Sequence, residues 1–226
     1  MPHSSKKYRK TETAPRKSGG KATFVVIGVV VAILVAAGGW YAYSSAQNTI
    51  HSSTTTTGNA IVYATLATSQ GTMKVELFGN ATPITVNNFV SLAQSGFYNN
   101  LVWHRIVKGF VIQTGDPNTR NGGGNKATWG QGGSNHTIPL EIVPSLHNDY
   151  GYLGMARASD PNSGSSQFYI NLANNTNLDG QYTVFGKVVS GMNVALALGN
   201  LSVDASSVPI NVSQAMLISV TISNTP

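Results

Sequence analysis

A single uncharged apolar segment divides this chain of 226 residues into two parts of different composition. It runs from Ala22 to Tyr43 and reads ATFVVIGVVVAILVAAGGWYAY. At about 1.5 Å per residue, a helix over this segment spans the roughly 30 Å hydrocarbon core of a bilayer. We therefore predict one transmembrane helix over residues 22–43, which leaves residues 60–226 to form a single globular domain.

The excess of positive charge lies before the apolar segment. Residues 1–21 hold seven Lys or Arg side chains and only Glu12 as an acid, so they account for the formal net charge of +6. This Ser-, Lys- and Gly-rich stretch has too little apolar surface to fold, and we expect a disordered tail. Basic and acidic residues balance in residues 60–226, so no basic face is expected there and we predict no nucleic-acid partner.

The residues that flank the apolar segment predict its orientation. Basic residues mark the cytoplasmic end of a membrane span, and Trp40 and Tyr41 suit the opposite membrane interface. We predict a single-pass membrane protein with a cytoplasmic N-terminus and an extracytoplasmic domain. The alternative is a cleaved signal peptide, because small side chains follow at residues 44–46, and the domain would then be secreted. The apolar run is longer than the roughly 15 residues of a signal peptide core, which favours the anchor.

The segment between the predicted helix and the domain has the composition of a tether. Residues 44–59 are rich in Ser and Thr and show no apolar periodicity. The chain has no cysteine, which excludes disulfides and thiolate metal sites. Its five histidines lack the spacing of a metal motif, so we expect neither a metal nor another cofactor.

Short β-rich runs dominate the predicted domain. The runs at 61–67 and 72–78 are separated by residues 69–71, Ser-Gln-Gly, which predicts a hairpin. A helix is predicted to begin with Thr82 as its N-cap and to stop at Gly96. The remaining predicted elements are a helix at 191–199 and β-rich runs at 101–107, 110–114, 137–142, 152–156, 166–172, 183–189 and 215–222. Many short strands and two helices indicate a mainly β fold, a closed antiparallel barrel or a sandwich, with the helices covering its openings.

Residues 103–116 read WHRIVKGFVIQTGD, which closely resembles the signature of the cyclophilin family of peptidyl-prolyl isomerases. In that family an Arg, a Phe and a Gln at this spacing line the proline-binding site. They match Arg105, Phe110 and Gln113, which the resemblance implies to be the catalytic residues. It also implies a closed, eight-stranded antiparallel barrel capped by two helices.

Two further blocks match the family in the same order, so the resemblance covers about residues 62–222. GYLGMARASDPNSGSSQFYINLA begins at Gly151, and LDGQYTVFGKVVSGMNV begins at Leu178. By this resemblance, the residues that line the substrate groove or the proline pocket are Val111, Gly122, Met155, Ala156, Arg157, Ala158, Gln167, Tyr169, Leu178 and Tyr182.

Four positions depart from the common family pattern. Asn177 stands where many eukaryotic relatives have Trp, Tyr182 where they have His, Val111 where Met is common, and Tyr169 where Phe is usual. The Trp contributes an indole donor and ring area to cyclosporin-like macrocycles, so we expect weak or no cyclosporin binding. Arg157 and Tyr182 resemble the residues of prokaryotic members.

The resemblance implies an enzyme that rotates Xaa-Pro peptide bonds in proline-containing polypeptides. With the domain predicted outside the cytoplasm, we expect it to assist the folding of exported or surface proteins. In the expected mechanism Arg105 donates a hydrogen bond to the prolyl nitrogen of the twisted amide, because a guanidinium is always charged and offers several N–H groups. The alternative is a non-catalytic module that binds proline-containing peptides as a chaperone or scaffold, which the altered residues Tyr182 and Asn177 leave open.

Overall fold

The computed structural model of the protein describes residues 61–225. The predicted tail at 1–21, the transmembrane helix at 22–43 and the linker at 44–59 lie outside the described residues. Between residues 61 and 225, no helix has the length and apolar character needed to cross a bilayer.

The described residues form nine strands, two α-helices and five 3-10 turns. The strands are β1 (Val62–Thr68), β2 (Gly71–Leu77), β3 (Leu101–Val102), β4 (Arg105–Val107), β5 (Val111–Thr114), β6 (Tyr152–Met155), β7 (Phe168–Asn171), β8 (Val184–Ser190) and β9 (Met216–Ser223). The helices are α2 (Pro83–Gln94) and α3 (Met192–Gly199), and the 3-10 turns are η1 (Pro117–Gly122), η2 (Lys126–Thr128), η3 (Pro161–Ser163), η4 (Thr176–Leu178) and η5 (Val212–Gln214).

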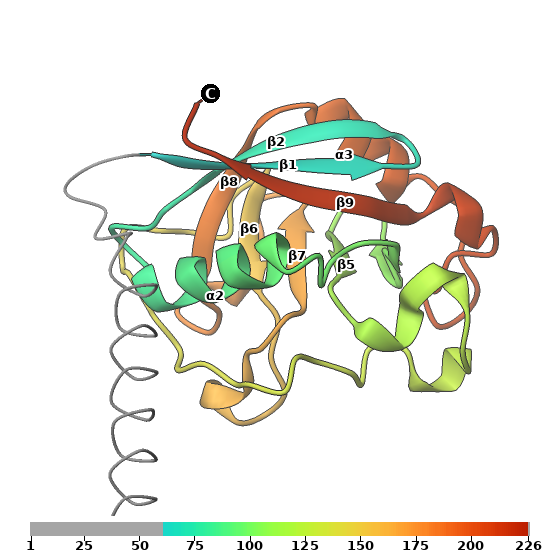
Figure 1. Cartoon of the computed structure of the whole chain (residues 1–226), viewed down its shortest axis with the longest axis horizontal. Coiled ribbons are helices and arrows are strands. Elements are labelled where there is room, and N and C mark those ends of the chain that lie inside the picture. The colour runs from blue at the N-terminus through green and yellow to red at the C-terminus, as the bar shows by residue number, and fades with distance from the viewer. Residues whose placement is uncertain (1–60, 226) are drawn as a thin grey trace, which may run out of the picture. The chain divides into compact units, whose positions relative to one another are not determined.

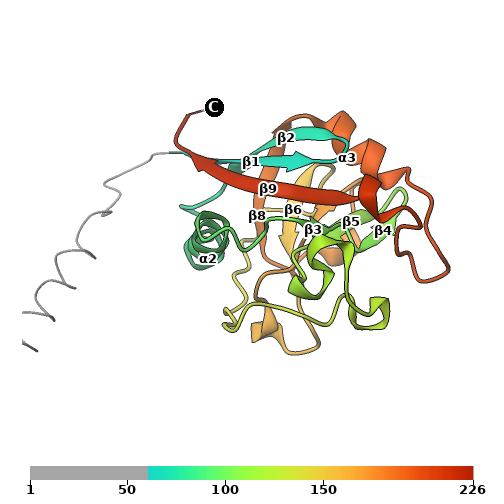
Figure 2. The same cartoon turned by 45° about the vertical axis from the view of Figure 1, so that its right-hand side comes forward.

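The strands join into one nine-stranded sheet in the order β3-β9-β1-β2-β8-β6-β7-β5-β4. Its two edge strands, β3 and β4, are separated in the chain by only Trp103 and His104. This link can span only about 10 Å, so the sheet has to curl until its edges come close together. Figures 1 and 2 show the strands wrapping around a common interior, with α2 and α3 at opposite ends.

The sheet departs from the predicted closed, eight-stranded barrel in two places. The expected run at 101–107 breaks into β3 and β4, because its first part pairs with β9 and its second part pairs with β5. The predicted strand at 137–142 is wrong: only an isolated bridge joins Ile138 to Gly164 there, since Pro139 has no N–H to extend a ladder. The mainly β fold with two helices is confirmed, whereas closure of an eight-stranded barrel is not.

A carboxylate from a distant loop caps the start of α2. Thr82 occupies the N-cap position, but its hydroxyl donates back to Phe78 O at 3.3 Å and caps no N–H group. The backbone N–H groups of Ile84 and Thr85 instead donate to the two carboxylate oxygens of Glu141, at 3.1 and 2.8 Å. The capping role predicted for the Thr82 side chain is therefore wrong, and Glu141 ties its loop to the helix.

An aromatic cluster fills the interior and fixes the strand that carries part of the site. Phe89 of α2 packs edge-on against Phe168 of β7, with ring centroids 5.3 Å apart, and Tyr98 and Phe185 complete the group. All four side chains are fully buried. Because successive strand residues point to opposite faces, anchoring Phe168 inward turns Tyr169 to the outer face of the sheet.

Candidate active site

The hairpin β4–β5 presents the first three candidate residues on the outside of the curled sheet. Its register pairs Arg105 with Gln113 and Val107 with Val111. The intervening turn uses Gly109 at a φ of +70°, a conformation that costs glycine little. The turn predicted around this glycine is confirmed, and it brings Phe110 back beside Arg105.

A row of directly opposed residues crosses three strands at this site. Arg105 of β4 pairs with Gln113 of β5, and Gln113 pairs with Tyr169 of β7. Directly opposed residues of antiparallel strands share one face, so these three side chains leave the sheet on the same side. Their neighbours in the next register, Ile112 and Ile170, are fully buried on the inner face.

This row forms part of the lining of a cavity of about 270 Å³. The cavity combines aliphatic and aromatic side chains with the two guanidinium groups at its edge. Its lining residues are Arg105, Phe110, Val111, Gln113, Ala156, Arg157, Tyr169, Leu178 and Tyr182. Nine of the predicted site residues therefore meet in one concavity, although they come from five separate stretches of the chain.

The guanidinium of Arg105 lies at the cavity, and hydrogen bonds within residues 61–225 do not occupy its N–H groups. Its central carbon lies 5.9 Å from the centre of the Phe110 ring. Within residues 61–225 the Arg105 side chain makes no hydrogen bond and no ion pair, so its N–H donors remain available to a bound molecule.

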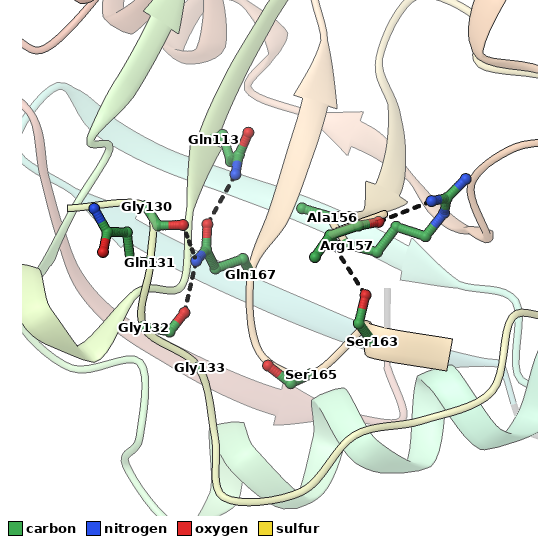
Figure 3. Close-up of a pocket in the computed structure, with 11 residues that line it drawn as sticks. Gln113, Gly130, Gln131, Gly132, Gly133, Ala156, Arg157, Ser163, Ser165 and Gln167 are labelled. Atoms are coloured by element: carbon green, nitrogen blue, oxygen red, sulfur yellow. Dashed lines mark hydrogen bonds between the residues drawn. The ribbon is translucent and has the colours of Figure 1, made fainter. Parts of the chain in front are cut away.

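A chain of amide hydrogen bonds orients Gln113. Gln167 donates its side-chain amide to Gly130 O at 3.0 Å and to Gly132 O at 2.6 Å (Figure 3). Its own carbonyl oxygen must then face the other way, and it accepts from Gln113 Nε2 at 2.8 Å. Among the described residues, this leaves the carbonyl oxygen of Gln113 as the free end of the chain of amides.

A second cavity of about 230 Å³ adjoins the first and shares Gln113, Ala156 and Arg157 with it (Figure 3). Gln167 and Ala158, which the family resemblance places at the site, both line this second cavity. The other lining residues were not predicted from the sequence; they are Gly130, Gln131, Gly132, Gly133, Ser163 and Ser165. No motif in the sequence marks these glycines, Ser163 or Ser165 as part of a site.

Arg157 and Tyr182 form a stacked pair at the edge of the first cavity. The Arg157 guanidinium lies 4.9 Å from the centre of the Tyr182 ring. Its Nε donates to Gln181 O at 2.9 Å and one terminal nitrogen donates to Ala158 O at 2.8 Å. Tyr182 in turn meets Tyr169 edge-on, with ring centroids 5.8 Å apart, so the pair is fixed from both sides.

Two predicted site residues lie away from both cavities. Met155 is only 3% exposed and belongs to the core. Gly122 has a φ of +68° and packs against Val212, where an added Cβ would lie 2.7 Å from Cγ1. Their part in substrate binding therefore stays a prediction.

A hairpin-borne Arg–Phe–Gln set, outside a curled antiparallel sheet with a helix at each end, defines the cyclophilin class of proteins. The chain belongs to this family: the model of cyclophilin-type peptidyl-prolyl cis-trans isomerases matches residues 63–222. It is therefore a cyclophilin-type peptidyl-prolyl cis-trans isomerase.

Curated relatives and solved structures agree with this assignment. Peptidyl-prolyl cis-trans isomerase-like 1 of Aspergillus fumigatus is 42% identical over 145 residues, which cover 64% of this chain and 86% of the relative. Peptidyl-prolyl cis-trans isomerase-like 3 of Dictyostelium discoideum is 39% identical over 162 residues, 72% of this chain and 96% of the relative. A crystal structure of a cyclophilin-type isomerase of Cryptosporidium parvum, determined in the presence of the dipeptide Ala-Pro, has a TM-score of 0.64 and 34% identity over 71% of this chain and 98% of that one.

Proposed function

We propose that the 270 Å³ cavity holds the proline ring of an Xaa-Pro segment while Arg105 stabilises the twisted peptide bond. The observation that carries this proposal is the unengaged guanidinium of Arg105 beside Phe110, at the edge of a partly apolar cavity. The presence of Ala-Pro with the Cryptosporidium relative supports a proline-containing peptide as the ligand class.

The chemistry needs no covalent intermediate. Rotation about a peptide C–N bond costs about 18–20 kcal/mol because resonance is lost in the twisted state. The prolyl nitrogen then gains a lone pair that can accept a hydrogen bond, which it cannot do in either planar isomer. A donor from Arg105 therefore binds the transition state more strongly than the ground states, which is what lowers the barrier.

The neighbouring groups assist this interaction. Phe110, Val111 and Leu178 surround the proline ring and exclude water, which strengthens the charge-assisted hydrogen bond from Arg105. The free carbonyl oxygen of Gln113 accepts from the substrate or from Arg105. An acceleration of about five decades requires roughly 7 kcal/mol, which several such contacts supply together.

A direct assay tests this function. The purified protein is added to an Ala-Pro peptide, and exchange between the cis and trans signals is followed by two-dimensional NMR. We expect exchange cross-peaks at substoichiometric protein, because each site turns over many peptides. Shifts of the peptide signals without exchange peaks would instead favour the second candidate, a non-catalytic chaperone or scaffold. This candidate is motivated by Tyr182, which replaces the usual His, and by Asn177, which replaces the usual Trp.

The proposed physiological role is assistance to the folding of exported or surface proteins. It rests on the uncharged segment at 22–43 and the basic residues before it, which favour an anchor with the domain outside the cytoplasm. Protease treatment of intact and lysed cells tests this topology. Cleavage of the domain in intact cells is expected, and protection until lysis would overturn it.

The altered cavity edge also bears on inhibitors. We propose that cyclosporin binds weakly, because Asn177 supplies neither an indole donor nor an aromatic ring. Asn177 is exposed within η4, directly before the cavity residue Leu178. Titration with cyclosporin, followed by inhibition of the exchange assay, checks this expectation.

A further inference from the structure

The tyrosine that lies in the proposed proline cavity has a buried hydroxyl group with a defined partner. Tyr169 is only 4% exposed, and its hydroxyl donates to Asn148 Oδ1 at 2.7 Å. Burial raises the pKa of Tyr169 well above its ordinary range, so the hydroxyl stays protonated and acts as a donor. The Tyr169 ring, which lines the cavity, is therefore fixed by a buried hydrogen bond to Asn148.

The backbone opposite Tyr169 allows the ring to reach this partner. Gly154 of β6 is the directly opposed residue in the sheet. A Cβ atom at this position would collide with the Cζ and hydroxyl atoms of Tyr169. The phenol ring thus lies across bare backbone at Gly154, and its hydroxyl reaches Asn148.

Asn148 is itself held so that its carbonyl oxygen faces the ring. Its backbone N–H donates to Asp179 Oδ1 at 2.7 Å and its side-chain amide donates to the same oxygen at 3.2 Å. The other carboxylate oxygen of Asp179 pairs with His147 Nδ1 at 2.9 Å. Because the NH₂ end of the amide is directed to a carboxylate, the acceptor end is fixed toward Tyr169.

The same contacts reach a second wall of the cavity. Asp179 directly follows Leu178, which lines the cavity, so its bonds to Asn148 also fix the end of η4. Asn148 is 1% exposed and lines neither of the two cavities described above, so it acts on bound peptide only through its neighbours. The shorter of the two bonds to Asp179 comes from the backbone N–H of Asn148, so a substitution of the Asn148 side chain leaves this tie to η4 in place.

We propose that Asn148 is a positioning residue for the isomerase, which holds the Tyr169 ring in the orientation that leaves room for the proline. This inference rests on the proposed function of the cavity. Without the Asn148 oxygen, the Tyr169 hydroxyl would be buried without an acceptor, a costly state for a polar group. The ring would then rotate to bring its hydroxyl to water, and this rotation would move the ring into the cavity.

A double-mutant cycle tests this coupling. The variants are Asn148→Val, Tyr169→Phe and the two together, assayed for kcat and KM on the Ala-Pro peptide. We expect Asn148→Val to lower kcat/KM about tenfold, mainly through KM, and Tyr169→Phe to lower it less than about threefold. In the Tyr169→Phe background no hydroxyl is left to satisfy, so Asn148→Val is expected to cost less than about threefold there.

A matched control separates this role from loop stabilisation. Asn174 also ties a neighbouring loop, since its Oδ1 accepts from Tyr150 N at 2.8 Å, but it is exposed and is not bonded to the Tyr169 ring. Asn174→Val is expected to keep wild-type kcat/KM. Urea unfolding of every variant shows whether it is folded. Should Asn148→Val not fold, Asn148→Ser takes its place, because a serine hydroxyl is too short to reach Tyr169.

An equal loss of kcat/KM in both backgrounds would overturn the proposal, because Asn148 would then act independently of the Tyr169 hydroxyl. Unchanged kcat/KM in Asn148→Val would overturn it as well. If the wild-type protein shows no turnover, the proposed function fails separately, and the same cycle is read from the affinity for the Ala-Pro peptide by NMR titration. The loss of affinity on Asn148→Val, and its rescue by Tyr169→Phe, then decide the question.

Discussion

Replacement of Arg105 by alanine should separate catalysis from folding. A hydrogen bond from a charged donor contributes about 1.5–3 kcal/mol, and each 1.4 kcal/mol is about a factor of ten in rate. Arg105→Ala should therefore lower kcat/KM by about 10- to 150-fold. Because the contact with the Phe110 ring is the only one that the guanidinium makes among residues 61–225, the free energy of unfolding should change by less than about 1 kcal/mol.

Arg120 provides a matched control. Its guanidinium also lies 5.9 Å from a phenylalanine ring, that of Phe97, but it donates to Asn99 O at 2.6 Å and to Phe97 O at 2.8 Å. Arg120→Ala should lower the free energy of unfolding by about 1–2 kcal/mol and leave kcat/KM nearly unchanged. Both variants are measured by NMR exchange on an Ala-Pro peptide and by urea unfolding. If Arg105→Ala retains wild-type kcat/KM, or loses it only in proportion to lost stability, the proposed mechanism is refuted.

Three further substitutions test other contacts. Glu141→Ala should lower the free energy of unfolding by about 1–2 kcal/mol in urea, because the first turn of α2 loses its carboxylate cap; an unchanged midpoint would contradict the capping role. Gln167→Glu cannot donate to the two glycine carbonyl oxygens, so kcat/KM should fall about tenfold, and full activity would show that Gln113 needs no such support. Burial lowers the pKa of His104 below its value in the unfolded chain. Below about pH 6.5 the unfolded state therefore binds more protons than the folded state. The free energy of unfolding then falls as the pH drops, by at most about 1.4 kcal/mol per pH unit. Urea unfolding at pH 7.5 and 5 should show a smaller difference for His104→Asn than for the wild type.

The parts of the site that are local in sequence were predictable. The β4–β5 hairpin follows from Gly109 at its turn, and strand alternation places Arg105 and Gln113 on one face. The helix at α2 was likewise visible from its apolar stripe and from Pro83 at its start. These features depend on neighbours in the chain, which a sequence pattern records.

The contacts that the sequence did not predict join distant segments. Glu141 caps a helix that begins more than fifty residues earlier, and no local pattern distinguishes it from the other acidic residues. The second cavity likewise combines Gly132 with Ser165, from two loops that only the fold brings together. Asn148 had one indirect signal: the usual Phe is Tyr at position 169, and a buried hydroxyl requires an acceptor.

The place of β9 in the sheet bears on how this protein is made. Residues 216–223 pair with β1 at the start of the domain and with β3, so the last strand lies between two of the earlier ones. A nascent chain can complete this sheet only after residues 216–223 have left the ribosome, since the second side of β1 has to wait for a partner more than 140 residues away. An enzyme that acts on prolyl peptide bonds thus leaves one side of its own β1–β2 hairpin without a partner strand until β9 has been made.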